Sequence, residues 1–166
     1  MRFSKAAILI LLCLWAGAAI MFAAIAAPAI FNPNVLDNRE LSGAIAGAIL
    51  RRLFQASYFV FGICLLLSLL GWLANRKPGN PMKLLFFLSL FLFCVNLAQD
   101  RLIRAEMVRI KLELKNTGDS RQTAELKNRF SRLHGLSTLL YGTSTLAALA
   151  GVAYVEIHRV RGSRKK

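Results

Sequence analysis

Charged residues in this chain are separated by long stretches that carry no charge. A helix needs about 20 apolar residues to cross a hydrocarbon layer of about 30 Å. Four stretches approach or exceed that length, at residues 6–36, 53–75, 84–99 and 133–155. The pattern predicts an all-α integral membrane four-helix bundle, a single domain over residues 1–166 with spans at about 8–31, 53–74, 83–102 and 134–156.

The third stretch is the shortest, and its flanks must help it to cross. About 16 residues of helix extend only about 24 Å. Lys83 and Arg101 can reach toward water from its two ends. Asn96 and Asp100 are then drawn to the edge of the apolar layer, where a polar group is costly and is a candidate for function.

The first stretch has an alternative interpretation as a secretory signal. Arg2 and Lys5 give a basic start, and the small residues at 23–27 resemble a cleavage site. The stretch is much longer than the apolar core of a signal, which favours a retained helix. Pro28 is expected to kink or end that helix, because proline has no N–H and clashes with the preceding turn.

The first two connections contain signals for caps and turns. Asp37 or Asn38 can cap a helix that precedes the second span. Gly43 and Gly47 in that helix have the GxxxG spacing that lets another backbone approach closely; chance in an alanine- and glycine-rich stretch is the alternative. Two prolines and a glycine in residues 76–81 predict a tight turn between spans two and three.

The third connection repeats apolar residues at helical spacing. The stripe consists of Ile103, Met107, Ile110 and Leu114. After a turn at 116–119, a similar pattern resumes on the way to the fourth span. We therefore expect helices three and four to extend beyond the membrane as an antiparallel hairpin over about residues 103–133. An amphipathic helix that lies on an anionic lipid surface is the alternative.

The chain is strongly basic, with 22 Lys and Arg against 8 Asp and Glu and a net charge of +14. A hydrophobic fraction of 56% and a mean hydropathy of +0.50 exclude a disordered chain. The bases lie between apolar stretches, and the basic tail at 159–166 has no interleaved aromatic residues. We expect contact with the anionic head groups of a lipid bilayer and no binding to nucleic acid.

An even number of spans places both termini on one side of the membrane. That side carries ten basic residues and the other side twelve, so the counts alone do not decide the orientation. The terminal side holds its bases in short tracts, whereas most acidic residues lie on the other side. We therefore expect the termini in the cytoplasm.

The chain offers few groups for catalysis or for metal binding. Cys13, Cys64 and Cys94 each lie alone in a separate apolar stretch, without a CxxC pair or a Cys/His cluster of zinc spacing. The sequence has no phosphate-binding glycine loop and no HExxH or GxSxG motif. These patterns favour a protein that is not an enzyme and that needs no cofactor.

Polar residues near one membrane face form the remaining candidate site. His134, Thr138 and Tyr141 share a face of the fourth helix, and Asn96 and Asp100 share a face of the third. Because a hairpin joins these helices, the two faces are expected at similar depth. Arg101 or Arg104 can pair with Asp100 and lower the cost of its charge.

Two interpretations of this candidate site are open. A hydrogen bond from His134 to Asn96 or Asp100 can simply hold two helices together. The other interpretation is a site for a ligand, a proton or a metal, for which His134 is the only candidate metal ligand. Haem or copper is the alternative cofactor, although a single histidine gives it weak support.

Small residues mark the helix faces that are expected to pack closely. Ala147 and Gly151 in the fourth helix repeat the spacing of Gly43 and Gly47. Such faces also suit a homo-oligomer or another membrane protein as partner. A transport path would need that oligomer, because four helices enclose little volume.

Three segments resemble markers of the transmembrane-protein-205-like family. They are residues 22–31, Val95–Asn96, and residues 130–137, which read FSRLHGLS. The likeness covers about residues 8–156. It implies a multi-pass protein of a bacterial inner membrane without an established reaction. Eukaryotic members are linked to platinum-drug resistance, which suggests the handling of solutes or metal complexes.

We therefore expect a non-enzymatic helix bundle that binds a lipid, solute or partner. A haem- or metal-handling redox protein that uses His134 is the alternative.

Overall fold

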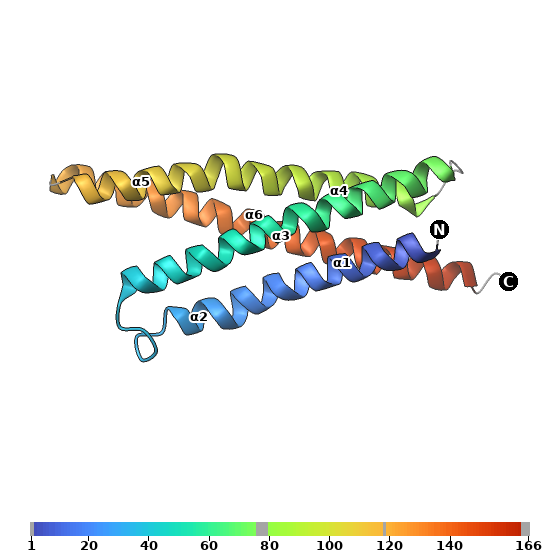
Figure 1. The fold of residues 1–166 in the computed structure, drawn as a ribbon, viewed down its shortest axis with the longest axis horizontal. Helices are drawn as coiled ribbons and strands as arrows, with labels where there is room; N and C mark the ends of the chain where they lie inside the picture. The colour runs from blue at the N-terminus through green and yellow to red at the C-terminus, as the bar shows by residue number, and fades with distance from the viewer. Residues whose placement is uncertain (1, 76–79, 118, 164–166) are drawn as a thin grey trace.

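The computed structural model describes residues 2–75, 80–117 and 119–163, which form four long helical rods (Figure 1). The first rod consists of α1 (Arg2–Met21), the π-helical segment η1 (Phe22–Ala26) and α2 (Ala27–Ile30), and the second is α3 (Arg39–Ala74). The third consists of α4 (Pro81–Ala98), the π-helical segment η2 (Gln99–Arg104) and α5 (Ala105–Asn116), and the fourth is α6 (Ser120–Ser163).

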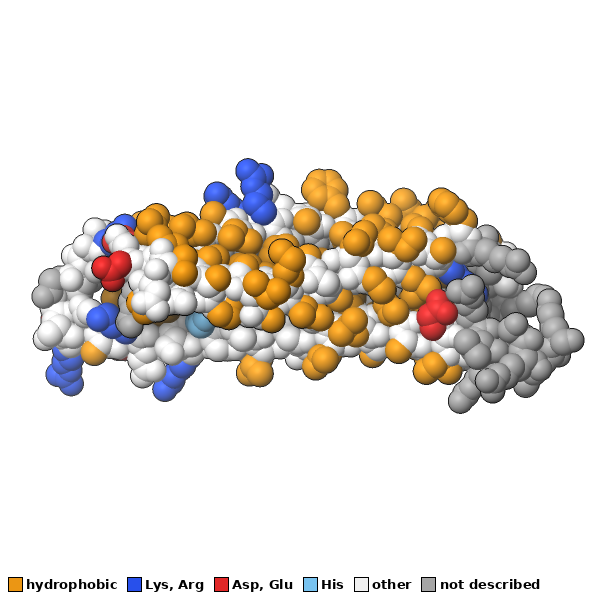
Figure 2. Space-filling view, turned by 90° about the horizontal axis from the view of Figure 1, so that it is seen from below, with side chains coloured by type: hydrophobic (Ala, Val, Ile, Leu, Met, Phe, Trp, Pro, Cys, Tyr) orange, Lys and Arg blue, Asp and Glu red, His pale blue; other side chains and the backbone are white. Residues whose placement is uncertain are grey.

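All four rods are long and apolar enough to cross a membrane. Large apolar side chains lie on their outer faces: Phe59 is 74% exposed, Leu139 70% and Leu146 69%. On the face that Figure 2 shows, hydrophobic side chains cover the middle, and most of the charged side chains lie toward the left. Soluble proteins rarely expose apolar surface on this scale. These are the features of an integral membrane protein.

Successive rods run in opposite directions, so α1 begins and α6 ends at the end of the molecule where α3 is followed by α4 (Figure 1). α3 packs against α1 and α4, and α6 packs against the same two helices. Their shared core contains Leu12, Trp15, Phe61 and Leu92, all buried. The rings of Trp15 and Phe61 meet edge-on with their centroids 4.8 Å apart.

Asparagine side chains cap the second and third rods. The Asn38 side chain accepts hydrogen bonds from the N–H groups of Glu40 and Leu41 at 2.9 and 3.2 Å, which confirms one of the two predicted caps. Asn80 caps α4 in the same way, and Pro81 takes the first helical position, where a missing N–H costs nothing. Residues 76–79 of the predicted turn, Gly118 of the third connection, and the side chains of the basic tail lie outside the described residues.

Helix one continues through Pro28 and ends two residues later, at Ile30. A proline ring clashes with the carbonyl four residues earlier, which here belongs to Ala24. Ala24 lies in η1, whose wider turn changes the hydrogen bonding at this point. The π-helical turn therefore lets the rod accept the proline before the chain leaves it.

α5 continues the rod of α4 and packs along the first part of α6 (Figure 1). In the predicted stripe, Ile103 and Ile110 are buried and Met107 and Leu114 are half-buried. Glu106 Oε1 and Arg129 Nη2 join the two helices at 2.7 Å. α5 and the first part of α6 therefore lie side by side as antiparallel helices.

Candidate functional site

The π-helical segment η2 interrupts the third rod and carries Asp100, Arg101 and Arg104. A π-helical turn has more residues per turn than an α-helix, and such turns occur often at functional sites. The segment has no sequence signature, because its residues have ordinary helix propensities. Its charged side chains lie where the apolar part of the rod ends.

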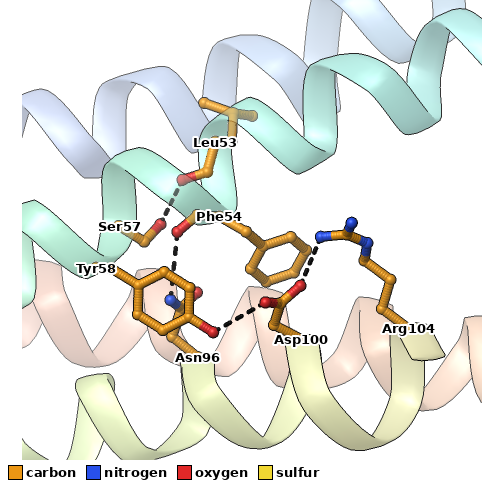
Figure 3. A network of polar contacts seen from close by, with 7 residues as sticks. All are labelled: Leu53, Phe54, Ser57, Tyr58, Asn96, Asp100 and Arg104. Carbon is orange, nitrogen blue, oxygen red and sulfur yellow. Dashed lines mark hydrogen bonds and ion pairs between the residues drawn. The ribbon is translucent and has the colours of Figure 1, made fainter.

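Asp100 connects η2 to α3 through Tyr58. The Tyr58 hydroxyl donates to Asp100 Oδ2 at 3.1 Å, and Arg104 Nη1 donates to Asp100 Oδ1 at 2.5 Å (Figure 3). The side chains of Asp100 and Arg104 are 21% and 37% exposed. Both carboxylate oxygens are thus bonded, which lowers the cost of placing this charge near apolar surface.

Two amide side chains make further bonds between rods on the same part of α4 and η2. Asn96 is 5% exposed, and its Nδ2 donates to the Phe54 carbonyl of α3 in a long bond of 3.5 Å. Gln99 is 3% exposed, and its Nε2 donates to the Ser137 carbonyl of α6 at 3.1 Å. The third rod is therefore bonded to both α3 and α6 through three side chains that lie within one turn or so of each other: Asn96, Gln99 and Asp100.

An aromatic cluster lies beside these bonds in the core. Trp15 Nε1 donates to Ser57 Oγ at 2.7 Å, and the Ser57 hydroxyl donates to the Leu53 carbonyl at 2.7 Å. The Tyr141 ring packs against Trp15 and Phe54 with centroids 6.0 and 6.5 Å apart. The Tyr141 hydroxyl is buried and has no hydrogen-bond partner among the described residues.

The structure does not bring His134 into this network. Its side chain is exposed on α6, and its ring stacks on Phe130 with centroids 6.3 Å apart. Thr138 is also exposed, and its hydroxyl donates to the His134 carbonyl within the same helix. The predicted contact between His134 and Asn96 or Asp100 is therefore wrong, because both of those side chains bond toward other groups. A role of these residues in ligand binding stays a prediction.

The predicted partner of Asp100 and the predicted packing faces have mixed outcomes. Arg104, and not the exposed Arg101, forms the ion pair.

Gly151 is buried so close to Leu88 of α4 that a Cβ there would overlap a leucine methyl group. Gly43 and Gly47 have nothing within 4 Å of an added Cβ, so this pair makes no close helix contact inside the described chain. Ala147, one turn before Gly151, is half-buried.

Metal ligands do not gather in the part of the chain that the structure describes. It contains no group of three or more His, Cys, Asp or Glu side chains that is arranged to hold a metal ion. Cys13 and Cys94 are exposed, and Cys64 is buried in the core. Sequence reasoning missed Tyr58, because a single tyrosine in an apolar stretch carries no spacing signal.

Part of this chain matches the model of a known protein family. Residues 10–116 match the family model described as a domain of unknown function, DUF4149. The chain belongs to the DUF4149 family. No curated protein and no solved structure gives a match. The more specific likeness to the transmembrane-protein-205-like family is not confirmed by this match, which establishes an uncharacterised family only.

The DUF4149 region ends with α5, so it contains the network but not the fourth rod. Tyr58, Asn96, Asp100 and Arg104 all lie inside it. His134, Thr138 and Tyr141 lie beyond its end. The side chains that the structure joins between the second and third rods therefore belong to the family region.

Proposed function

We propose that this DUF4149 protein is a non-enzymatic integral membrane helix bundle that binds anionic lipid head groups. The binding surface is a set of five arginines, Arg51, Arg52, Arg101, Arg104 and Arg132, which we call the arginine belt. The observation that carries the proposal is that these residues, from three different rods, fall at one level of the bundle.

Two hydrogen bonds support that common level. The bond between Tyr58 and Asp100 aligns α3 with η2, and the bond between Gln99 and Ser137 aligns η2 with α6. Because neighbouring rods run in opposite directions, residues before Tyr58 lie beside residues after Asp100 (Figure 1). In α6, residues before Ser137 lie toward the same end of the bundle as the residues before Tyr58 and after Asp100 (Figure 1).

Helix rise then gives the distances along the bundle. At 1.5 Å per residue, Arg51 and Arg52 lie about 10 Å beyond Tyr58, and Arg104 lies about 6 Å beyond Asp100. Arg132 lies about 8 Å beyond Ser137. The arginine belt thus occupies a layer about 10 Å deep. The head-group region on each side of a bilayer is of similar thickness, about 5–8 Å.

The environment of the arginine belt suits phosphate rather than protein carboxylate. Arg51, Arg52, Arg101 and Arg132 are exposed, and no described acidic side chain forms an ion pair with any of these four. Arginine side chains can reach from an apolar helix face to the membrane surface. Each base near an anionic surface contributes about 1 kcal/mol.

α5 and the first part of α6, which continue beyond the arginine belt, are proposed to stand in water as the extramembrane hairpin. Over α5 the chain extends about 18 Å further by helix rise. Its polar side chains pair there: Glu106 with Arg129, Arg109 with Glu113, and Lys115 with Glu40 at the start of α3. We propose that both termini lie in the cytoplasm of a bacterial cell. The helix face at Gly43 and Gly47 has open space beside it, which leaves room for a second copy of the chain.

Lipid retention in native mass spectrometry tests the proposal. Protein is extracted from nanodiscs that contain equal amounts of phosphatidylglycerol and phosphatidylcholine, and the retained lipids are counted. We expect preferential retention of phosphatidylglycerol. Changing the four unpaired arginines of the belt to glutamine is expected to lower this preference about tenfold or more, since four contacts of about 1 kcal/mol exceed the 1.4 kcal/mol of a tenfold change.

The matched control removes four bases from the proposed extramembrane hairpin instead. The positions are Arg109, Lys115, Arg121 and Lys127, all exposed. The same loss of preference in the control would contradict the proposal, because it would mean that net charge alone attracts the lipid. The preparation is also checked for a haem absorption band and for bound copper. Either one would support the alternative, a haem- or metal-handling redox protein that uses His134.

A further inference from the structure

The first and third rods differ in apolar length by about 13 Å. The first rod carries no charged residue over residues 6–30, which is about 37 Å of helix, and the third carries none over residues 84–99, about 24 Å. The second and fourth rods fall between them, with about 33 Å over residues 53–74 and about 34 Å over residues 133–155. Because α3 and α6 both pack against α1 and α4, the longest and the shortest apolar surfaces lie diagonally opposite each other in the bundle.

The apolar surfaces of these two rods begin at the same level on the side of the termini. Side-chain bonds align both helices with α3: Trp15 of α1 bonds to Ser57, and Asn96 of α4 bonds to the carbonyl three residues before Ser57. By helix rise, Lys5 and Lys83 then each lie about 15 Å from the level of Ser57, toward the termini. The difference in apolar length therefore lies at the other end of the two rods.

Lys83 has the surroundings of a residue at a membrane surface. Its Nζ lies over the ring of Trp72, 6.0 Å from the centroid, and that ring packs against Phe86 and Phe87 with centroids 5.5 and 6.1 Å apart. Tryptophan is enriched where helices leave the hydrocarbon, and lysine reaches from there toward water. This cluster places the surface of the bilayer at the level of Lys83.

On the side of the α5–α6 hairpin, the third rod becomes charged long before the first. Asp100 lies about 10 Å beyond the level of Ser57. Both of its carboxylate oxygens are bonded, to Tyr58 and to Arg104, so the side chain is held at this depth. The first rod continues without a charge to Ile30, about 22 Å beyond the level of Ser57. One flat head-group layer does not fit both rods at this end.

The outer surface of the last part of the first rod is apolar. Met21 and Ile25 are 62% and 66% exposed, and the exposed residues at 23–24 and 28–29 are alanine and proline. This surface continues the lipid-facing surface of α1, on which Ile10 is also exposed. Its side chains offer neither a charge nor a hydrogen bond to a polar partner. Hydrocarbon is therefore the occupant that this continuous surface fits.

We propose that the bilayer leaflet on the hairpin side is thinner beside the third rod than beside the first, and that acyl chains cover η1 and α2. The step is about 12 Å by helix rise. A bilayer accommodates helices of different apolar length by local thinning or thickening at a modest cost. The surface beside η2 then suits phospholipids with shorter acyl chains. The proposal rests on the head-group level proposed for the arginine belt, but not on the preference of the belt for anionic lipid.

Spin labels at matched levels of the two rods test the proposal in a bilayer of phosphatidylcholine alone. The first pair, on the hairpin side, is Ile25 and Leu102, about 15 and 13 Å beyond the level of Ser57. The second pair, on the side of the termini, is Ile10 and Phe87, about 8 and 9 Å from that level. All four positions are exposed, and each label is placed in a cysteine-free chain. Depth is measured as the ratio of accessibility to oxygen and to a water-soluble nickel complex.

We expect Ile25 in the hydrocarbon and Leu102 at head-group depth, with a ratio several-fold higher at Ile25. Ile10 and Phe87 are expected to give equal ratios. This second pair is the matched control, because a tilt of the whole bundle would separate both pairs by the same amount. A difference between Ile10 and Phe87 as large as that between Ile25 and Leu102 would therefore overturn the proposal.

Two further outcomes would also overturn it. An Ile25 label that neither reagent reaches would mean that protein and not lipid covers this surface. Equal ratios at Ile25 and Leu102, both at head-group depth, would mean a flat leaflet and would leave the arginine belt standing. Conversely, an arginine belt without preference for anionic lipid would leave the step standing, because the bilayer in this experiment has no net charge.

Discussion

Tyr58 and Tyr141 allow one substitution to be compared in two environments. The Tyr58 hydroxyl donates to Asp100 Oδ2 at 3.1 Å, whereas the Tyr141 hydroxyl is buried without a partner among the described residues. Replacing either tyrosine by phenylalanine removes a single oxygen. We therefore expect Tyr58→Phe to lower the free energy of unfolding and Tyr141→Phe to leave it unchanged or raise it.

The size of each effect follows from the environment of the hydroxyl. A hydrogen bond to a charged group contributes about 1.5–3 kcal/mol in soluble proteins, but bonds between membrane helices average about 0.6 kcal/mol. Asp100 is 21% exposed, which further reduces the contribution. We expect Tyr58→Phe to cost about 1 kcal/mol. Tyr141→Phe removes a desolvated group that bonds to nothing, so a gain of up to about 1 kcal/mol is expected.

Unfolding in mixed detergent micelles, followed by circular dichroism, measures both changes. Adding Asp100→Asn completes a double-mutant cycle with Tyr58→Phe, and we expect a coupling of about 0.5–1 kcal/mol. The same cycle with Tyr141→Phe should give no coupling. An equal loss in both tyrosine variants, or zero coupling between Tyr58 and Asp100, would refute the reasoning.

Three further predictions concern packing, the histidine and the orientation. Gly151→Ala is expected to cost about 1 kcal/mol, because its Cβ overlaps Leu88, whereas Gly47→Ala meets open space and should cost nothing; a Leu88→Ala background should remove the difference in thermal unfolding. His134→Ala should change stability by less than about 0.5 kcal/mol in the same assay, since the side chain is exposed; a larger loss would indicate contacts that the structure lacks. With the termini in the cytoplasm, a cysteine at Val35 in a cysteine-free chain should react with a membrane-impermeant maleimide added to intact cells; protection would reverse the orientation.

The helices themselves could be predicted because their signals are local. The four apolar stretches depend on composition, and the cap at Asn38 depends on one side chain and the two N–H groups after it. The stripe from Ile103 to Leu114 needs only the period of one helix. Each of these features is decided within a few turns of chain.

The contacts between helices could not be predicted in the same way. Periodicity correctly placed Asn96 and Asp100 on one face, but it does not say which neighbour that face meets; both bond to α3 and not to α6. The predicted polar face of α6 is divided for a related reason. Tyr141 lies where α6 joins the core, whereas His134 and Thr138 lie where α6 packs along η2 and α5. A helix as long as α6 changes neighbours along its length.

The depth of the arginine belt in the membrane is the most direct test of the account. Spin labels are placed at the exposed positions Leu102 and Ser131 beside the arginine belt, and at Leu139 on the apolar surface, and their accessibility to oxygen and to a water-soluble nickel complex is measured. The account predicts head-group depth at Leu102 and Ser131 and hydrocarbon depth at Leu139. Labels beside the arginine belt that lie in the hydrocarbon centre, or free in water at the same level as Lys127, would contradict it.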